Sequence, residues 1–132
     1  MSDFYLFIRK ELYYLGLLSL GAVPGAFIRW QIDDNFIVNI CGSTVLGFLI
    51  SFPLKYQYKL MLGVGFCGAL TTFSSWMIDS VELILRGALL KALALIFSAF
   101  VFGLAAAAIG FIIGKRINSS RPFLLRFLFR RY

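Results

Sequence analysis

The chain has 132 residues, of which 61% are hydrophobic, 17% aromatic and 14% charged, and its formal net charge is +7. So little polar surface cannot cover a water-soluble globule, and the composition therefore indicates a membrane protein. The apolar segments leave no room for a separate catalytic domain, and the sequence contains no histidine to hold zinc or to transfer protons. We therefore expect that the protein is not an enzyme.

Four charge-free runs follow one another along the chain, at residues 12–28, 35–54, 60–78 and 92–114. A helix needs about 20 apolar residues to cross the hydrocarbon core, so each run fits one span. We predict a single all-α transmembrane domain over residues 1–114, with spans at about 12–32, 35–54, 60–84 and 88–114. The N-terminal residues lack the features of a signal peptide, so we expect the first span to be retained.

The cationic residues are unevenly distributed between the two predicted sides of the membrane. Ten of the thirteen Lys and Arg residues precede span one, flank the turn between spans two and three, or follow span four. These regions share one side, and the positive-inside bias assigns both termini to the cytoplasmic face of the cell's inner (plasma) membrane.

The basic tail, residues 115–132, mixes arginines with Phe and Leu. We predict that it lies along the inner headgroups as an amphipathic anchor. A partly disordered tail that only sets the topology fits the sequence equally well. Direct attachment to a membrane span favours lipid over nucleic acid as the partner of this tail.

Three polar residues in the first two spans are candidates for a functional role. Arg29 closes span one, where it either snorkels to the headgroups or borders an aqueous vestibule that attracts anions. Asn39 and Ser43 lie four residues apart on one stripe of span two. They form either a track of hydrogen-bond donors for an anion or an ordinary polar contact between helices, and spacing alone favours the contact.

The third span is interrupted by glycine and hydroxyl residues. Residues 63–76 contain three glycines, a Thr pair and a Ser pair. Such residues are costly in a membrane helix unless the freed backbone groups face protein, an ion or water. We therefore predict a broken third helix with a functional site at the break.

These motifs resemble those of the Fluc (CrcB) family of fluoride channels. The resemblance rests on residues 21–29 (GAVPGAFIR), residues 39–43 (NICGS) with Gly47, and residues 65–74 (GFCGALTTFS). Their order and spacing agree with the family pattern over residues 16–114, and the last motif is highly specific.

The resemblance implies an antiparallel dimer of four-helix subunits with two narrow fluoride pores and a central structural sodium ion. It places Asn39, Ser43, Phe73, Trp76 and Ser98 in the fluoride pore, Arg29 in the vestibule, and the backbone carbonyls of Gly68 and Thr71 on the sodium. The resemblance also implies that the protein carries out passive fluoride export across the cell membrane, which gives resistance to fluoride toxicity. Passive transport agrees with the lack of a nucleotide-binding loop and of a well-placed intramembrane carboxylate.

Three features set this chain apart from the family pattern. Trp76 stands where the family usually has a second Phe, Ser98 is the only polar residue between Ala92 and Gly114, and the cations favour one orientation. These features favour one subunit of a heteromeric pair over a homodimer, because copies that all point one way cannot form an antiparallel interface. Two alternatives are a non-conducting assembly subunit of such a channel and a small multidrug exporter, although an exporter needs a membrane-embedded Glu.

Overall fold

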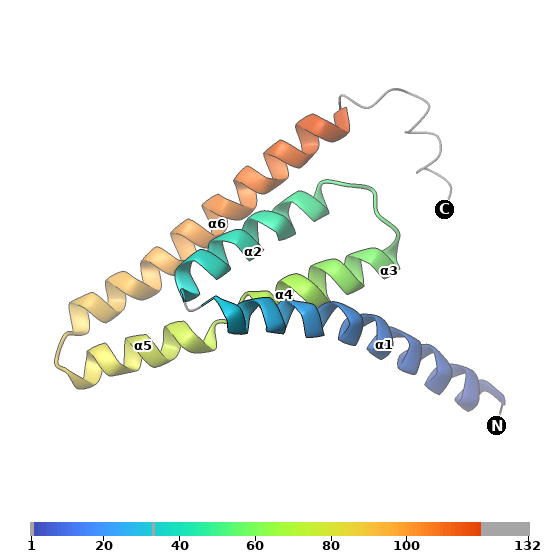
Figure 1. The fold of residues 1–132 in the computed structure, drawn as a ribbon, viewed down its shortest axis with the longest axis horizontal. Coiled ribbons are helices and arrows are strands. Elements are labelled where there is room, and N and C mark those ends of the chain that lie inside the picture. Colours follow the sequence, from blue (N-terminus) through green and yellow to red (C-terminus); the bar gives the residue numbers. More distant parts are fainter. Residues whose placement is uncertain (1, 33, 120–132) are drawn as a thin grey trace.

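The computed structural model describes residues 2–32 and 34–119, and every regular element in that part of the chain is helical. Figure 1 shows the arrangement of α1 (Ser2–Gln31), α2 (Asn35–Ile50), α3 (Tyr56–Tyr58), the π-helix η1 (Lys59–Cys67), α4 (Gly68–Leu70), α5 (Ser74–Leu85) and α6 (Leu89–Ser119). The elements α3, η1 and α4 follow one another without a gap and form the first half of a helix that stops before α5. The predicted all-helical fold with a broken third helix is confirmed.

Two of the helices are long and apolar enough to cross a bilayer. They are the stretch Phe4–Gln31 of α1 and the whole of α6, with 28 and 31 residues, whereas α2 is a shorter apolar helix of 16 residues. Large apolar side chains cover the outside of both long helices, and Leu20 and Leu90 are 68% and 84% exposed. An apolar surface of this extent suits contact with lipid or with partner helices.

Both long helices continue beyond the charge-free runs of the sequence. Helix α1 begins at Ser2 and passes through the charged residues Arg9, Lys10 and Glu11 before it reaches the apolar run. Helix α6 continues to Ser119, so residues 115–119 of the predicted tail are helical. Residues 120–132, on which the predicted amphipathic anchor depends, lie outside the described residues.

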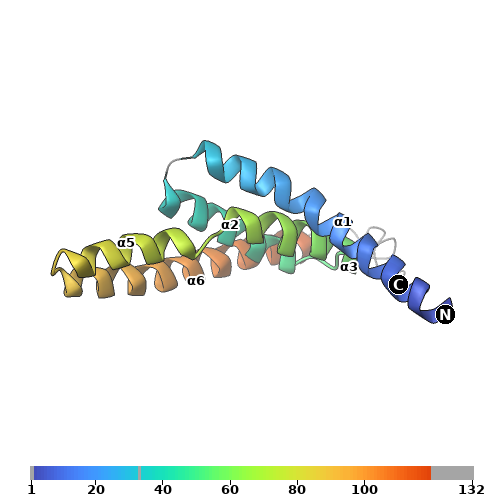
Figure 2. The same cartoon turned by 90° about the horizontal axis from the view of Figure 1, so that it is seen from below.

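The break lies where the third helix passes from one neighbour to another. Its first half, mainly η1, packs along α1, whereas α5 packs along α6, and α2 packs along α6 as well (Figures 1 and 2). Gly87, with φ of 74°, makes the tight turn between α5 and α6. The core between these helices is thin, and its fully buried side chains include Val38 and Cys67.

Close helix contacts depend on two glycines that face each other's helix. A Cβ added to Gly47 of α2 would overlap the carbonyl oxygen of Ala107 in α6, and a Cβ added to Gly110 of α6 would overlap that of Thr44 in α2. Backbones that approach so closely are typical of membrane helix pairs, in which van der Waals packing replaces the hydrophobic effect.

We expect Gly110→Ala to destabilise the α2–α6 pair by about 1–3 kcal/mol, because the methyl group forces two backbones apart. The matched control is Gly16→Ala in α1, where an added Cβ meets no atom within 4 Å. This control should be neutral or stabilise the helix by up to about 1 kcal/mol. Thermal unfolding of the purified variants, followed by tryptophan fluorescence, measures both effects, and an equal loss in the two variants would contradict this packing.

Candidate functional site at the helix break

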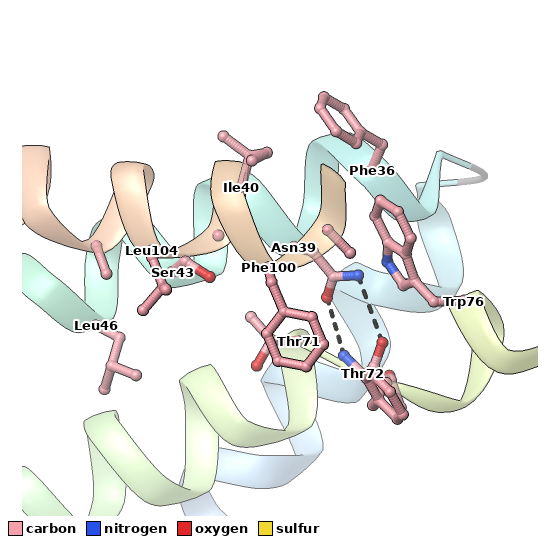
Figure 3. Close-up of a pocket in the computed structure, with 14 residues that line it drawn as sticks. Phe36, Asn39, Ile40, Ser43, Leu46, Thr71, Thr72, Trp76, Phe100 and Leu104 are labelled. Carbon is pink, nitrogen blue, oxygen red and sulfur yellow. Dashed lines mark hydrogen bonds between the residues drawn. The ribbon is translucent and has the colours of Figure 1, made fainter. Parts of the chain in front are cut away.

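The break frees backbone groups that a continuous helix would pair. Thr71 is extended, with φ of −91° and ψ of 117°, so the helix ends at Leu70. In a continuous helix the Thr72 N–H would donate to the Gly68 carbonyl, but here it donates to Asn39 Oδ1 at 3.0 Å. Asn39 Nδ2 in turn donates to the Thr72 carbonyl at 3.4 Å, and Figure 3 shows this reciprocal pair. The Asn39 side chain therefore replaces a peptide group of the interrupted helix.

Arg29 caps the first half of the broken helix. Its Nη1 donates to the Leu70 carbonyl at 3.2 Å, and its Nη2 donates to Asn35 Oδ1 at 3.1 Å. The half-buried guanidinium thus joins the end of α1, the break and the start of α2. The sequence analysis predicted either snorkelling or a vestibule for Arg29. Neither interpretation predicted that Arg29 contacts the helix break.

Arg29→Lys should loosen the break although it keeps the positive charge. A lysine ammonium lacks the planar fork with which arginine reaches two acceptors in different directions. Loss of a charge-assisted hydrogen bond is expected to lower the local stability by about 1.5–3 kcal/mol, measured as faster hydrogen exchange of the amides at residues 70–73. Arg86→Lys is the control, because the ion pair of Arg86 with Glu82 is exposed and contributes about 0–1 kcal/mol. Equal exchange in both variants would contradict the capping role.

A cavity of about 410 Å³ lies beside the break, between α2, α6 and the start of α5. Its polar lining consists of Asn39, Ser43, Thr71 and Thr72, and the rest of the lining is apolar. No charged residue is among the described residues that line it. The structure therefore brings Asn39 and Ser43 of α2 together with the break, as Figure 3 shows. An uncharged cavity with amide and hydroxyl groups can bind a small ion without holding it too tightly.

Phe73 and Trp76 line the same cavity but differ in exposure. Phe73 is 57% exposed, and its ring lies 6.3 Å from that of Phe100, centroid to centroid. Trp76 is 7% exposed and packs against Phe36, with ring centroids 5.9 Å apart. Phe36 and Phe100 were not among the predicted site residues, because nothing in their local sequence distinguishes them from the other aromatic residues of apolar helices.

Ser98 lies at a second cavity, of about 490 Å³, which has an acidic lining. Asp34 and Asp79 line this cavity together with Ser98, and Trp76 belongs to the lining of both cavities. The Ser98 hydroxyl donates to the Leu95 carbonyl of its own helix at 2.8 Å. The structure thus does not bring Ser98 together with Asn39 and Ser43, and its place in a pore stays a prediction.

The backbone at Gly68 and Thr71 has the donor chemistry of a cation site. The Gly68 carbonyl has lost its helical N–H partner to Asn39, and the Gly68 Cα is exposed with open space around it. The extended conformation of Thr71 turns its carbonyl away from the helical direction. The described residues contain no cluster of three acidic, Cys or His side chains. The carbonyl oxygens of Gly68 and Thr71 therefore fit a hard monovalent cation, which unwound membrane helices commonly bind.

An apolar helical chain with a broken helix beside an uncharged, polar cavity has the architecture of a membrane transport protein. The family described as CrcB-like protein, Camphor Resistance (CrcB), matches residues 16–111. The chain belongs to this family, and the resemblance found in the sequence motifs is confirmed.

Relatives that are named as fluoride channels cover most of the chain. Fluoride-specific ion channel FluC 2 of Prochlorococcus marinus (strain MIT 9313) is 48% identical over 104 residues, which cover 79% of this chain and 84% of the relative. FluC 2 of Synechococcus sp. (strain CC9902) is 46% identical over 116 residues, 84% of this chain and 87% of the relative. FluC 1 of Listeria monocytogenes serotype 4b (strain F2365) is 35% identical over 111 residues, which cover 74% of this chain and 94% of the relative. These relatives are channels by name, and the expectation that the chain is not an enzyme is confirmed.

Proposed function

We propose that this chain is a subunit of a passive, fluoride-selective channel that exports fluoride across the inner (plasma) membrane. The observation that carries the proposal is the amide of Asn39, which joins the broken helix to an uncharged cavity. Family membership and the relatives named as fluoride-specific ion channels support fluoride as the ion.

The lining of this cavity suits a small, strongly hydrated anion. Asn39 Nδ2 carries two hydrogens and uses one for the Thr72 carbonyl, so the second can donate to an anion. The Ser43 hydroxyl is a further donor on the same stripe. The ring edges of Phe73 and Phe100 are positive and attract an anion more weakly than a full charge does. Together these groups can replace water around fluoride without trapping it.

Sodium and Arg29 have supporting roles in this proposal. The carbonyls of Gly68 and Thr71 would hold a sodium ion, and because one chain offers two such carbonyls, a second subunit would complete the site. When bound, the ion would supply a fixed positive charge at the helix break. Arg29 borders the vestibule, where its charge raises the local concentration of anions while its hydrogen bonds hold the break.

The assembly is an antiparallel dimer of four-span subunits. α1, α2, the broken third helix and α6 are the spans, and both termini of this subunit lie in the cytoplasm. The uneven cations fix one orientation, so an oppositely oriented homologue completes the pair more readily than a second copy.

Fluoride efflux from liposomes, followed with a fluoride electrode, tests both parts of the proposal. Liposomes that contain this chain and an oppositely oriented homologue should release fluoride rapidly, and liposomes with this chain alone should not. Robust efflux from the chain alone would reject the partner requirement and leave the channel function intact. Absence of efflux from both preparations, with the dimer shown to be assembled, would reject the channel function.

A non-conducting assembly subunit is the second candidate, and the position of Ser98 favours it. Because Ser98 lies at the acidic cavity, helix α6 contributes no polar side chain to the cavity of Asn39. In this case the pores would be lined mainly by the partner. A pore variant in each subunit separates the two candidates, since only variants of the conducting subunit would reduce efflux. A multidrug exporter has less support, because Glu82 is exposed at the end of α5 and pairs with Arg86.

A further inference from the structure

Trp76 forms the wall between the two cavities and carries a hydrogen-bond donor. Trp76 and Phe36 line both the uncharged cavity and the acidic cavity, and their rings pack against each other. The Trp76 side chain is 7% exposed, so its position is set by packing. An indole ring differs from a phenyl ring by one N–H group, which is a donor only.

The indole N–H of Trp76 has no acceptor among the described residues. Buried indole nitrogens usually donate a hydrogen bond, so an unused one calls for an explanation. Among the described residues, Thr72 Oγ1 is the fully buried side-chain polar atom without a hydrogen-bond partner. The indole nitrogen of Trp76 is therefore not fully buried. The indole N–H thus keeps some accessible surface and has no acceptor among the described residues, and its residue lines both cavities.

The uncharged cavity is the side on which this donor can serve an anion. In Figure 3 the indole nitrogen lies on the edge of the ring that faces the amide nitrogen of Asn39, and both residues line this cavity. The Asn39 amide keeps one N–H after its bond to Thr72. The acidic cavity, which Trp76 also lines, contains Asp34 and Asp79, and their carboxylates repel anions. The uncharged cavity thus has two N–H donors, from Asn39 and Trp76, and no carboxylate in its lining.

We propose that the Trp76 indole N–H donates a hydrogen bond to fluoride, which it shares with the Asn39 amide at the wall between the two cavities. This inference rests on the proposed channel function and specifies the chemistry of one position in it. The family resemblance places a phenyl ring at this position, which can offer an anion its weakly positive edge. In this chain the indole replaces that edge with a hydrogen bond to a charged acceptor, which is about twice as strong as a neutral one.

Indole resonances of this chain, assembled with its unlabelled homologous partner, provide a direct test that does not depend on flux. The sequence has two tryptophans, and Trp30 is 78% exposed and packs against Phe27, away from both cavities. With ¹⁵N-labelled indoles in lipid nanodiscs, sodium fluoride should shift the Trp76 N–H resonance in a saturable way. Sodium chloride should leave it in place, and the Trp30 resonance should not respond to either salt. Trp30→Phe assigns the two resonances.

Removal of the N–H without a change of shape tests the consequence for transport. Replacement of Trp76 by 3-benzothienylalanine, in which sulfur takes the place of the N–H, should reduce fluoride efflux at least about tenfold. The same replacement at Trp30 should leave efflux unchanged. A Trp76 resonance that ignores fluoride, or full efflux with the sulfur analogue at position 76, would overturn this inference while the channel function stands. A fluoride-dependent shift in an assembled dimer that does not conduct would instead contradict the channel function and retain the site.

Discussion

Asn39→Ala is expected to reduce fluoride efflux by about tenfold to a hundredfold, since a hydrogen bond to a charged acceptor contributes about 1.5–3 kcal/mol. The structure adds a second consequence, because the same side chain pairs with the backbone of Thr72. The variant therefore loses an anion donor and also leaves the broken helix with unpaired groups. Fluoride-electrode efflux measures the first effect, and thermal unfolding of the purified protein measures the second.

Two further variants separate these effects. Asn39→Asp keeps an oxygen that accepts from the Thr72 N–H but removes both amide hydrogens and adds a negative charge to an uncharged cavity. It should abolish efflux at least as completely as alanine. Asn118→Ala is the matched control, because Asn118 also donates to a backbone carbonyl, that of Ser51, at 3.4 Å, away from both cavities. Efflux that survives in Asn39→Asp, or fails equally in Asn118→Ala, would contradict the role of Asn39 as an anion donor.

Removal of sodium is expected to have the second large effect. If sodium is present at about 100 times its dissociation constant, it stabilises the assembly by about 2.7 kcal/mol, so its removal shifts the assembly equilibrium about 100-fold. The proposed site consists of the Gly68 and Thr71 carbonyls, and the described residues offer no cluster of three acidic, Cys or His side chains as another metal site. Efflux and the dimer fraction, measured after dialysis into N-methylglucamine, should therefore fall together.

Potassium provides the matched condition for the sodium experiment. It has the same charge as sodium but a larger radius, so it separates a specific site from a general effect of ionic strength. Restoration by sodium and not by potassium is the expected result. An unchanged dimer fraction and unchanged efflux in N-methylglucamine would show that the break does not depend on a bound cation.

The residues of the break could be predicted from the sequence because they conflict with a helical membrane span. The glycine and hydroxyl residues between Gly63 and Trp76 predicted an interruption of the third helix, and the structure places the extended residue at Thr71. The long π-helix before the break could not be predicted, since the apolar residues 59–67 fit an ordinary α-helix equally well. The predicted membrane spans also did not give the helix ends, because a charged segment such as Arg9 to Glu11 does not stop a helix.

The candidate site was predicted in part. Asn39, Ser43, Phe73 and Trp76 line one cavity, but sequence spacing within α2 could not show that Asn39 pairs with the backbone 33 residues further along. Ser98 illustrates the opposite limit. Ser98 was predicted to be a pore residue, and the packing of α6 places it at a different cavity from that of Asn39. Tertiary contacts, which no local pattern encodes, set both outcomes.

Comparison of fluoride with chloride efflux from the same liposomes tests the central claim most directly. The wild-type complex, reconstituted in sodium and assembled from this chain and its homologue, should release fluoride rapidly and retain chloride, and Asn39→Asp in this chain should stop the fluoride release. Equal release of both anions, or fluoride release that is independent of Asn39, would contradict a selective pore at the helix break.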